Sequence, residues 1–146
     1  MERFEKMFSQ LQRYVAITGL SIVSFTIIYF GILVELQYYA EKNSAKIKDK
    51  TELEALVDVE KMKLGLERKI ITRIEENGRN YWGRTQEGID VIVINKNHMN
   101  LGNLRHEMQH ASDGQNDTKP PNFIDHYFWR EPRAVIYAFK KSLEGN

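Results

Sequence analysis

Residues 15–34 contain the feature that most limits what this chain can fold into. These twenty consecutive positions carry no charged side chain. At a rise of about 1.5 Å per residue, a helix of that length crosses the roughly 30 Å hydrocarbon core of a bilayer. The stretch is too long for the apolar part of a signal peptide, and no small-residue cleavage site follows it. We therefore predict one retained transmembrane helix and a single-pass membrane protein.

This span divides the chain into four predicted parts. Residues 1–14 form an N-terminal tail, and residues 35–50, which are polar and rich in lysine, form a juxtamembrane linker. Residues 51–146 form one small domain. Basic side chains flank both ends of the span in similar number, so the positive-inside rule leaves the side of the membrane open.

Composition narrows the chemistry of the domain. The chain has 21 basic and 20 acidic side chains, and this balance argues against a nucleic-acid partner. No cysteine occurs, which excludes disulfides, thiolate metal ligands and cysteine nucleophiles. Any metal must therefore be held by His, Asp or Glu, and the oligomeric state stays open.

Strand-like runs in the middle of the domain predict a small sheet. They occupy residues 69–75, 80–85 and 89–95. Asn77-Gly78 favours a tight hairpin between the first two runs, and residues 86–88 supply a second turn. We expect a three-stranded antiparallel sheet, with its apolar last strand bordering a cleft and able to pair with an extended peptide.

Helices are predicted on either side of this sheet. Thr51 and Glu54 form a capping-box pattern that starts the first helix, which ends near Gly65. Asn100 can cap a helix over residues 101–111, and residues 132–143 favour a last helix after a loop. The predicted class is therefore α+β, with one N-terminal transmembrane helix.

The residues that carry chemistry lie in the second of these helices. His106-Glu107-Met108-Gln109-His110 has the HExxH pattern, and the i to i+4 spacing puts both imidazoles on one helical face. Two such imidazoles can chelate one metal ion. Glu107 beside them can accept a proton from a metal-activated water and pass it to a leaving amine.

A catalytic zinc ordinarily takes a third protein ligand from elsewhere in the chain. We favour Glu131, because it stands at the start of the last helix, where Val135 and Phe139 continue its face and Ala134 permits close approach. Other oxygen and nitrogen donors downstream remain alternatives: Asp113, Asp117, Asp125 and His126. Asp113 could instead orient a ligand histidine.

Taken together, residues 106–110 and Glu131-Pro132-Arg133-Ala134 resemble the small gluzincins, or minigluzincins, whose third-ligand helix carries an ExxA pattern. The resemblance covers residues 51–143. It implies a zincin-like minimal core and a Zn²⁺ ion held by His106, His110 and Glu131. It further implies hydrolysis of peptide or protein substrates with Glu107 as the general base. Metzincin spacing is out of register after His110, and deformylases require a cysteine.

Several neighbouring residues are secondary candidates. His126 and Tyr127 could each stabilise an oxyanion. Arg105 and Arg133 could orient carboxylates near the metal, and the aromatic run 127–129 is expected to pack in the core. The principal alternative function is a non-catalytic, membrane-tethered interaction module with a structural or vestigial metal site.

Overall fold

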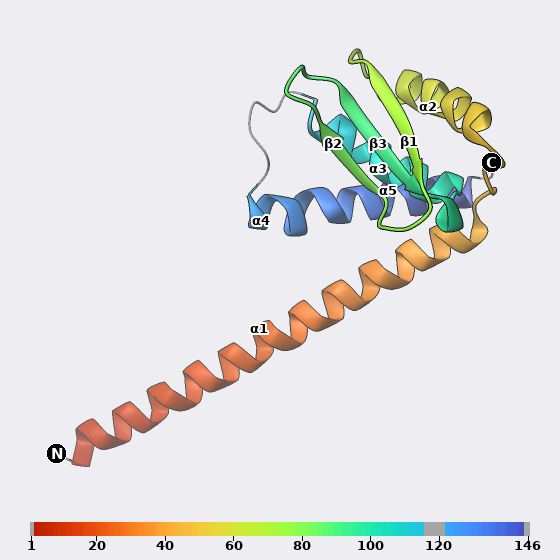
Figure 1. Ribbon diagram of the computed structural model, residues 1–146. Helices are drawn as coiled ribbons and strands as arrows, with labels where there is room; N and C mark the ends of the chain where they lie inside the picture. The colour runs from red at the N-terminus through yellow and green to blue at the C-terminus, as the bar shows by residue number, and fades with distance from the viewer. Residues whose placement is uncertain (1, 116–121, 145–146) are drawn as a thin grey trace. The chain divides into compact units, whose positions relative to one another are not determined.

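The structure is a computed structural model that describes residues 2–115 and 122–144. Contacts divide the chain into two compact units, Met1–Val34 and Glu35–Asn146. The second unit combines helices with a small sheet, which confirms the α+β class (Figure 1).

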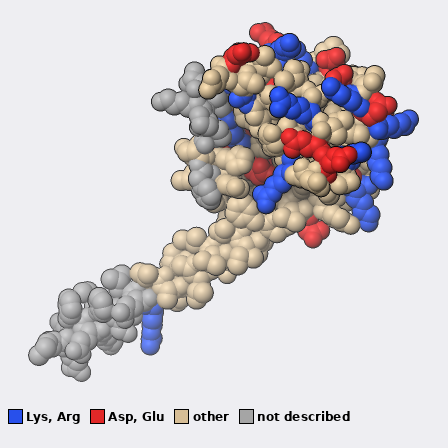
Figure 2. Space-filling model, viewed as in Figure 1, with Lys and Arg blue, Asp and Glu red and all other residues tan. Residues whose placement is uncertain are grey.

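The first unit consists of the larger part of helix α1 (Glu2–Asn43). Most of its described apolar side chains are exposed, with Leu20, Phe25 and Ile27 each more than 60% accessible. Figure 2 shows uncharged residues along most of its described surface, whereas acidic and basic side chains mix over the second unit. Because water-soluble proteins rarely expose so long an apolar surface, this helix is one that could span a membrane.

Residues 35–50, expected to form a linker, belong to the second compact unit. Ala40 is fully buried and Ile47 is 4% exposed. The chain also forms a β-bridge here, because the Ile47 N–H donates to the Met99 carbonyl at 3.0 Å and the Leu101 N–H donates to the Ala45 carbonyl at 2.9 Å. The folded domain therefore begins earlier than composition indicated.

Helix α2 (Lys50–Leu64) begins one residue before the predicted start. Its N-cap is Asp49, whose carboxylate accepts from the Glu52 N–H at 2.9 Å, in place of the expected Thr51. Glu52 in turn accepts from the N–H of Lys48, the residue before the N-cap, so the helix is capped two residues earlier than predicted. The end is as predicted, with Gly65 in the left-handed conformation at φ 64°.

Three strands form the sheet: β1 (Ile70–Glu75), β2 (Tyr81–Arg84) and β3 (Asp90–Asn95). Their order is β1-β3-β2, with β3 parallel to β1 and antiparallel to β2. The predicted antiparallel sheet is therefore wrong, and so is the hairpin at Asn77-Gly78. The second turn is confirmed, since the Thr85 N–H donates to the Ile89 carbonyl and Gly88 has φ 79°.

The strand order follows from how apolar each strand is. Strand β3 is the most buried, with Ile92, Val93 and Ile94 fully inaccessible. A central strand has both of its edges covered by neighbouring strands, so the most apolar strand takes that place. The loop after β1 must therefore cross the end of β3. Asn95 holds that crossing, because its side-chain amide donates to the Gly78 carbonyl and its backbone N–H donates to Asn80 Oδ1.

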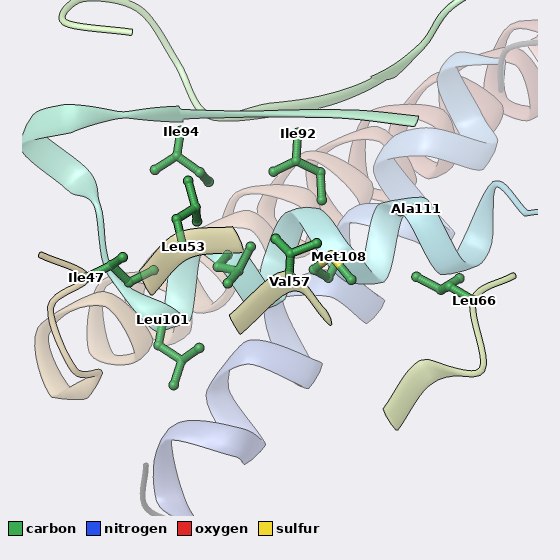
Figure 3. Close-up of a cluster of buried hydrophobic side chains, with 10 residues drawn as sticks. Ile47, Leu53, Val57, Leu66, Ile92, Ile94, Leu101, Met108 and Ala111 are labelled. Carbon is green, nitrogen blue, oxygen red and sulfur yellow. The ribbon is translucent and has the colours of Figure 1, made fainter. Parts of the chain in front are cut away.

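Helix α3 (Leu101–Asp113) lies against the sheet and contacts α2 and α5. Asn100 caps it as predicted, accepting from the Asn103 N–H at 2.9 Å. Figure 3 shows Ile92 and Ile94 from β3 facing side chains from α2 and α3. The core comprises Ile47, Leu53, Val57, Leu66, Ile92, Ile94, Leu101, Leu104, Met108 and Ala111.

The last part of the described chain contains a short turn α4 (Phe123–Asp125), a π-helical turn η2 (His126–Arg130) and helix α5 (Glu131–Leu143). Helix α5 contacts α3, and its residues Ala134, Val135 and Ala138 are all buried. The aromatic run 127–129 is not core, because Trp129 is 66% exposed. Successive helical residues point about 100° apart, so three in a row cannot share one buried face.

Candidate metal centre

Helix α3 presents His106 and His110 on one face. Both side chains are buried, and their Nε2 atoms lie 3.1 Å apart. Their rings meet edge to face with centroids 4.8 Å apart. The predicted i to i+4 pairing of the two imidazoles is therefore present in the structure.

Glu131 reaches the same point from the start of α5. One carboxylate oxygen lies 3.3 Å from His106 Nε2, and the other lies 3.2 Å from His110 Nε2. Side-chain ligand atoms of all three residues lie within 4.8 Å of one another, so this group could hold a metal ion. Two imidazole nitrogens and one carboxylate oxygen form a donor set that first-row transition ions accept.

The carboxylate of Glu131 stays ionised in this setting. Burial raises its pKa, but the facing imidazoles of His106 and His110 lower it by more, so the net pKa lies below the usual range for glutamate. A charged carboxylate opposite two imidazoles is the protonation state that a cation requires.

Glu107 lies beside the histidines with an accessible fraction of 5%. Burial raises its pKa to about 7, and the nearby charge of Glu131 raises it too, against the opposing effect of His110. A backbone hydrogen bond from Trp82 on β2 holds the carboxylate. A carboxylate whose pKa lies near neutrality can both accept and return a proton at that pH.

These residues line an open cleft of about 1060 Å³. Strand β2 forms one wall, and its neighbours Asn80 and Thr85 extend that wall at both ends. The opposite wall comes from η2 and the start of α5. Strand β3, expected to border the cleft, is central in the sheet with both edges paired, so β2 takes that place.

His126 and Tyr127, the two oxyanion candidates, both line the cleft. The His126 ring stacks on His110 with centroids 5.7 Å apart, and its Nε2 lies 3.9 Å from Glu131 Oε2. Burial lowers the pKa of His126, so its ring is neutral near pH 7. The π-helical turn η2 places both residues beside the metal ligands, and π-helical turns are common at functional sites.

The remaining ligand candidates lie elsewhere or outside the described residues. Asp113 accepts from Gln109 at 2.9 Å and pairs with Arg133 at 3.2 Å. Asp125 pairs with Arg130 at 2.7 Å. Asp117 lies outside the described residues. Glu131 is thus the carboxylate that converges with both histidines among the described candidates.

Arg105, a candidate for orienting a carboxylate near the metal, instead has its side chain on the other side of α3. It is 4% exposed, and its Nε donates to Glu60 at 3.2 Å. Lys63 and Tyr137 also donate to Glu60, at 2.8 and 2.9 Å. We call Glu60, Lys63, Arg105 and Tyr137 the Glu60 cluster. It joins α2, α3 and α5 behind the site.

Gln37, which the sequence did not point to, contacts the site directly. Its Oε1 lies 3.1 Å from His106 Nδ1, across 69 positions of sequence. It falls in the stretch expected to be a linker, where nothing in the local pattern distinguishes it from a solvated glutamine. Only the contact with His106 in the folded structure shows that Gln37 belongs to the site.

The fold and site therefore define an α+β unit in which two histidines and a glutamate could bind one metal ion. Comparison with models of known families, with curated proteins and with solved structures finds no match to this chain. The functional argument consequently depends on the geometry of the site.

Proposed function

We propose that this chain is a membrane-anchored zinc peptidase of the gluzincin type. The observation that carries the proposal is the convergence of His106, His110 and Glu131. Tetrahedral zinc with bonds of about 2.0 to 2.2 Å holds its ligand atoms about 3.3 Å apart. The two Nε2 atoms are 3.1 Å apart, and each lies 3.2 to 3.3 Å from a different oxygen of Glu131, so the carboxylate faces both imidazoles at separations close to those of zinc ligands.

The residues around the ligands support hydrolysis. A zinc ion held by the three side chains would supply a Lewis acid that activates water as the nucleophile. Glu107 would accept the proton of that water on its carboxylate and deliver it to the leaving amine. His126 is in position to donate to the oxygen of the attacked carbonyl, since it lines the cleft beside Glu131.

The cleft favours an extended peptide as the substrate. Strand β2 pairs with β3 alone in the described sheet, so its outer edge faces the cleft as the edge of a β-sheet. An extended peptide could add to such an edge through main-chain hydrogen bonds, independent of its side chains. This would place a scissile carbonyl between β2 and the histidines.

The decisive experiment measures zinc content and hydrolysis of a peptide library by the full chain in detergent. The parent should bind one zinc ion and cleave peptides. Glu107→Gln should keep the metal and lose about 10² to 10⁴ in rate, the usual contribution of a general base. Glu54→Gln, at an exposed glutamate on α2, is the matched control and should match the parent.

Two outcomes would contradict the proposal. Equal cleavage by the parent and Glu107→Gln would remove Glu107 from the mechanism. Zinc binding without any hydrolysis would favour the alternative of a non-catalytic, membrane-tethered interaction module with a structural metal.

Membrane anchoring is a separate part of the proposal. It is supported by the exposed apolar face of residues 15–34, which a bilayer would cover. Carbonate extraction of cell membranes should leave the full chain in the pellet. Release into the supernatant, or an N-terminus that begins beyond residue 34 in the mature protein, would contradict a retained anchor.

A further inference from the structure

A chain of side-chain hydrogen bonds leads from the backbone of the loop before α3 to the ring of His106. The His98 carbonyl accepts from Asn103 Nδ2 at 2.8 Å, and Asn103 Oδ1 accepts from Gln37 Nε2 at 2.9 Å. Gln37 Oε1 then lies 3.1 Å from His106 Nδ1. Asn103 is 2% exposed and His106 is 8% exposed, so water competes little along this path.

The His98 carbonyl at the start of this hydrogen-bond series determines which group donates and which accepts in every later bond. A backbone carbonyl can only accept, so Asn103 must turn its NH₂ group toward His98 and its oxygen toward Gln37. Gln37 must then turn its own NH₂ group toward Asn103. Glu41 requires the same orientation, because its carboxylate oxygen lies 3.3 Å from Gln37 Nε2 and can also only accept.

The consequence falls on the tautomer of His106. With the amide oxygen of Gln37 facing Nδ1, that nitrogen must carry the proton and donate it. A neutral imidazole protonated on Nδ1 has a lone pair on Nε2, the atom that faces His110 and Glu131. This is the form in which a histidine binds a metal through Nε2.

We propose that Gln37 is a positioning residue that holds His106 in its metal-binding tautomer and orientation. The inference rests on the proposed function in treating His106 as a zinc ligand, but the tautomer itself is a property of the metal-free protein. Gln37 lies in α1 only three positions after residue 34, the end of the apolar segment. The part of the helix that directly follows this segment therefore supplies part of the metal centre.

A close helix contact brings Gln37 to this place. Gly102, in the first turn of α3, has no Cβ, and a Cβ there would lie 2.7 Å from the Ala40 carbonyl oxygen. The backbone of α1 can therefore approach α3 one turn beyond Gln37. Ala40 is fully buried by this approach.

The first test reads the tautomer directly in the metal-free full chain in detergent. Nitrogen NMR of histidine-labelled protein, with His106 assigned through His106→Asn, should show the parent protonated on Nδ1. Gln37→Leu should lose this preference, since leucine offers no acceptor. Gln10→Leu makes the same exchange at an exposed position of α1 and should match the parent. Retention of the Nδ1–H form in Gln37→Leu would overturn the inference.

The second test measures zinc affinity by competition with a chelator. Gln37→Leu should bind zinc about 10- to 100-fold more weakly than the parent, the range for loss of a residue that orients a ligand. Gln37→Glu retains an acceptor toward Nδ1 and should bind more tightly than Gln37→Leu. Equal affinities of Gln37→Leu and the parent would overturn the inference while leaving the zinc site intact. A parent that binds no zinc would instead defeat the proposed function, and the tautomer measurement would still decide the role of Gln37.

Discussion

Helix α3 buries charged groups on two sides, and the two sides differ in how those groups are matched. In the Glu60 cluster one carboxylate receives hydrogen bonds from Arg105, Lys63 and Tyr137. On the metal side, His106, His110 and Glu131 bring electron-pair donors together within 4.8 Å. Both sides bury charged groups. In the Glu60 cluster a carboxylate is paired with complementary donors, whereas on the metal side the buried groups are arranged as ligands for a cation.

Two buried glutamates show the same contrast. Burial raises the pKa of Glu60, but the hydrogen bonds of Lys63 and Tyr137 and the charge of Arg105 bring it below the usual value. Burial raises the pKa of Glu107 to about 7, and the charge of Glu131 adds to that effect. A buried carboxylate hydrogen-bonded to cations stabilises a fold, and one whose pKa burial raises to near neutrality is suited to proton transfer.

The largest predicted effect comes from breaking the Glu60 cluster. Arg105→Leu removes the buried cation and leaves Glu60 poorly matched, which should lower the free energy of unfolding by about 4 kcal/mol. Denaturant unfolding of the full chain in detergent measures it. Arg73→Leu, at an exposed arginine on β1, is the control. A cost for Arg105→Leu no greater than for Arg73→Leu would show that the cluster is not what holds the three helices.

The next effect is a pH dependence on the metal side. Because the folded pKa of Glu107 is raised from 4.5 to about 7, the metal-free folded state retains its proton over that interval. The contribution of Glu107 to stability is then complete below pH 4.5 and is lost as pH rises to 7. The loss should be roughly 3 kcal/mol.

Glu107→Gln, which cannot titrate, isolates this contribution. Unfolding of metal-free parent and variant at pH 4.5 and pH 7 gives the difference, and the parent should lose more stability than the variant. The depressed pKa of Glu60 acts in the opposite sense, because its contribution is lost on acidification below the usual glutamate range. Parallel pH profiles of parent and Glu107→Gln would contradict the raised pKa.

Removal of the third ligand should give a somewhat smaller change, and one confined to metal binding. Glu131→Ala should weaken zinc binding by about 100-fold. Loss of a residue that only orients a ligand costs up to that much, and loss of a ligand should cost no less. Its metal-free stability should not fall as that of Arg105→Leu does, because Glu131 is only half-buried and its ion pairs are with the histidines 106, 110 and 126, which are not permanent cations. Unchanged zinc affinity would exclude Glu131 from the ligand set.

The smallest predicted effect tests the approach of α1 to α3. Alanine normally favours a helix over glycine by about 1 kcal/mol. At Gly102, however, the added Cβ would lie 2.7 Å from the Ala40 oxygen, so Gly102→Ala should destabilise by about 2 kcal/mol. Gly31→Ala, where no atom lies within 4 Å, is the control. A stabilised Gly102→Ala would show that the helices are not in close contact there.

Features set by neighbouring residues could be predicted from the sequence. The caps at Asn100 and Gly65 and the pairing of His106 with His110 all follow from spacing of three to five residues. Glu131 was predicted by the start of a helix and the resemblance to a ligand pattern, and the structure brings it to both histidines.

Features that depend on residues distant in the sequence could not be predicted. Asn77-Gly78 is a strong local hairpin pattern, but β3 is more apolar than β2 and takes the central place beside β1. Arg105 and Glu60 are 45 positions apart, and neither marks the other in sequence. Gln37 was hidden for the same reason, since polar composition alone suggested a solvated linker around it.

Helix α3 is buried on all sides, and this limits how its sequence can change over evolutionary time. Every residue from Leu101 to Ala111 is buried, although many are polar. A helix on a protein surface has a water-facing side where most exchanges are neutral, but this segment has none. Each substitution there meets either the apolar core, the Glu60 cluster, α1 or the metal ligands. We expect this segment to diverge most slowly, with drift confined to outward positions of α2, β1 and α5.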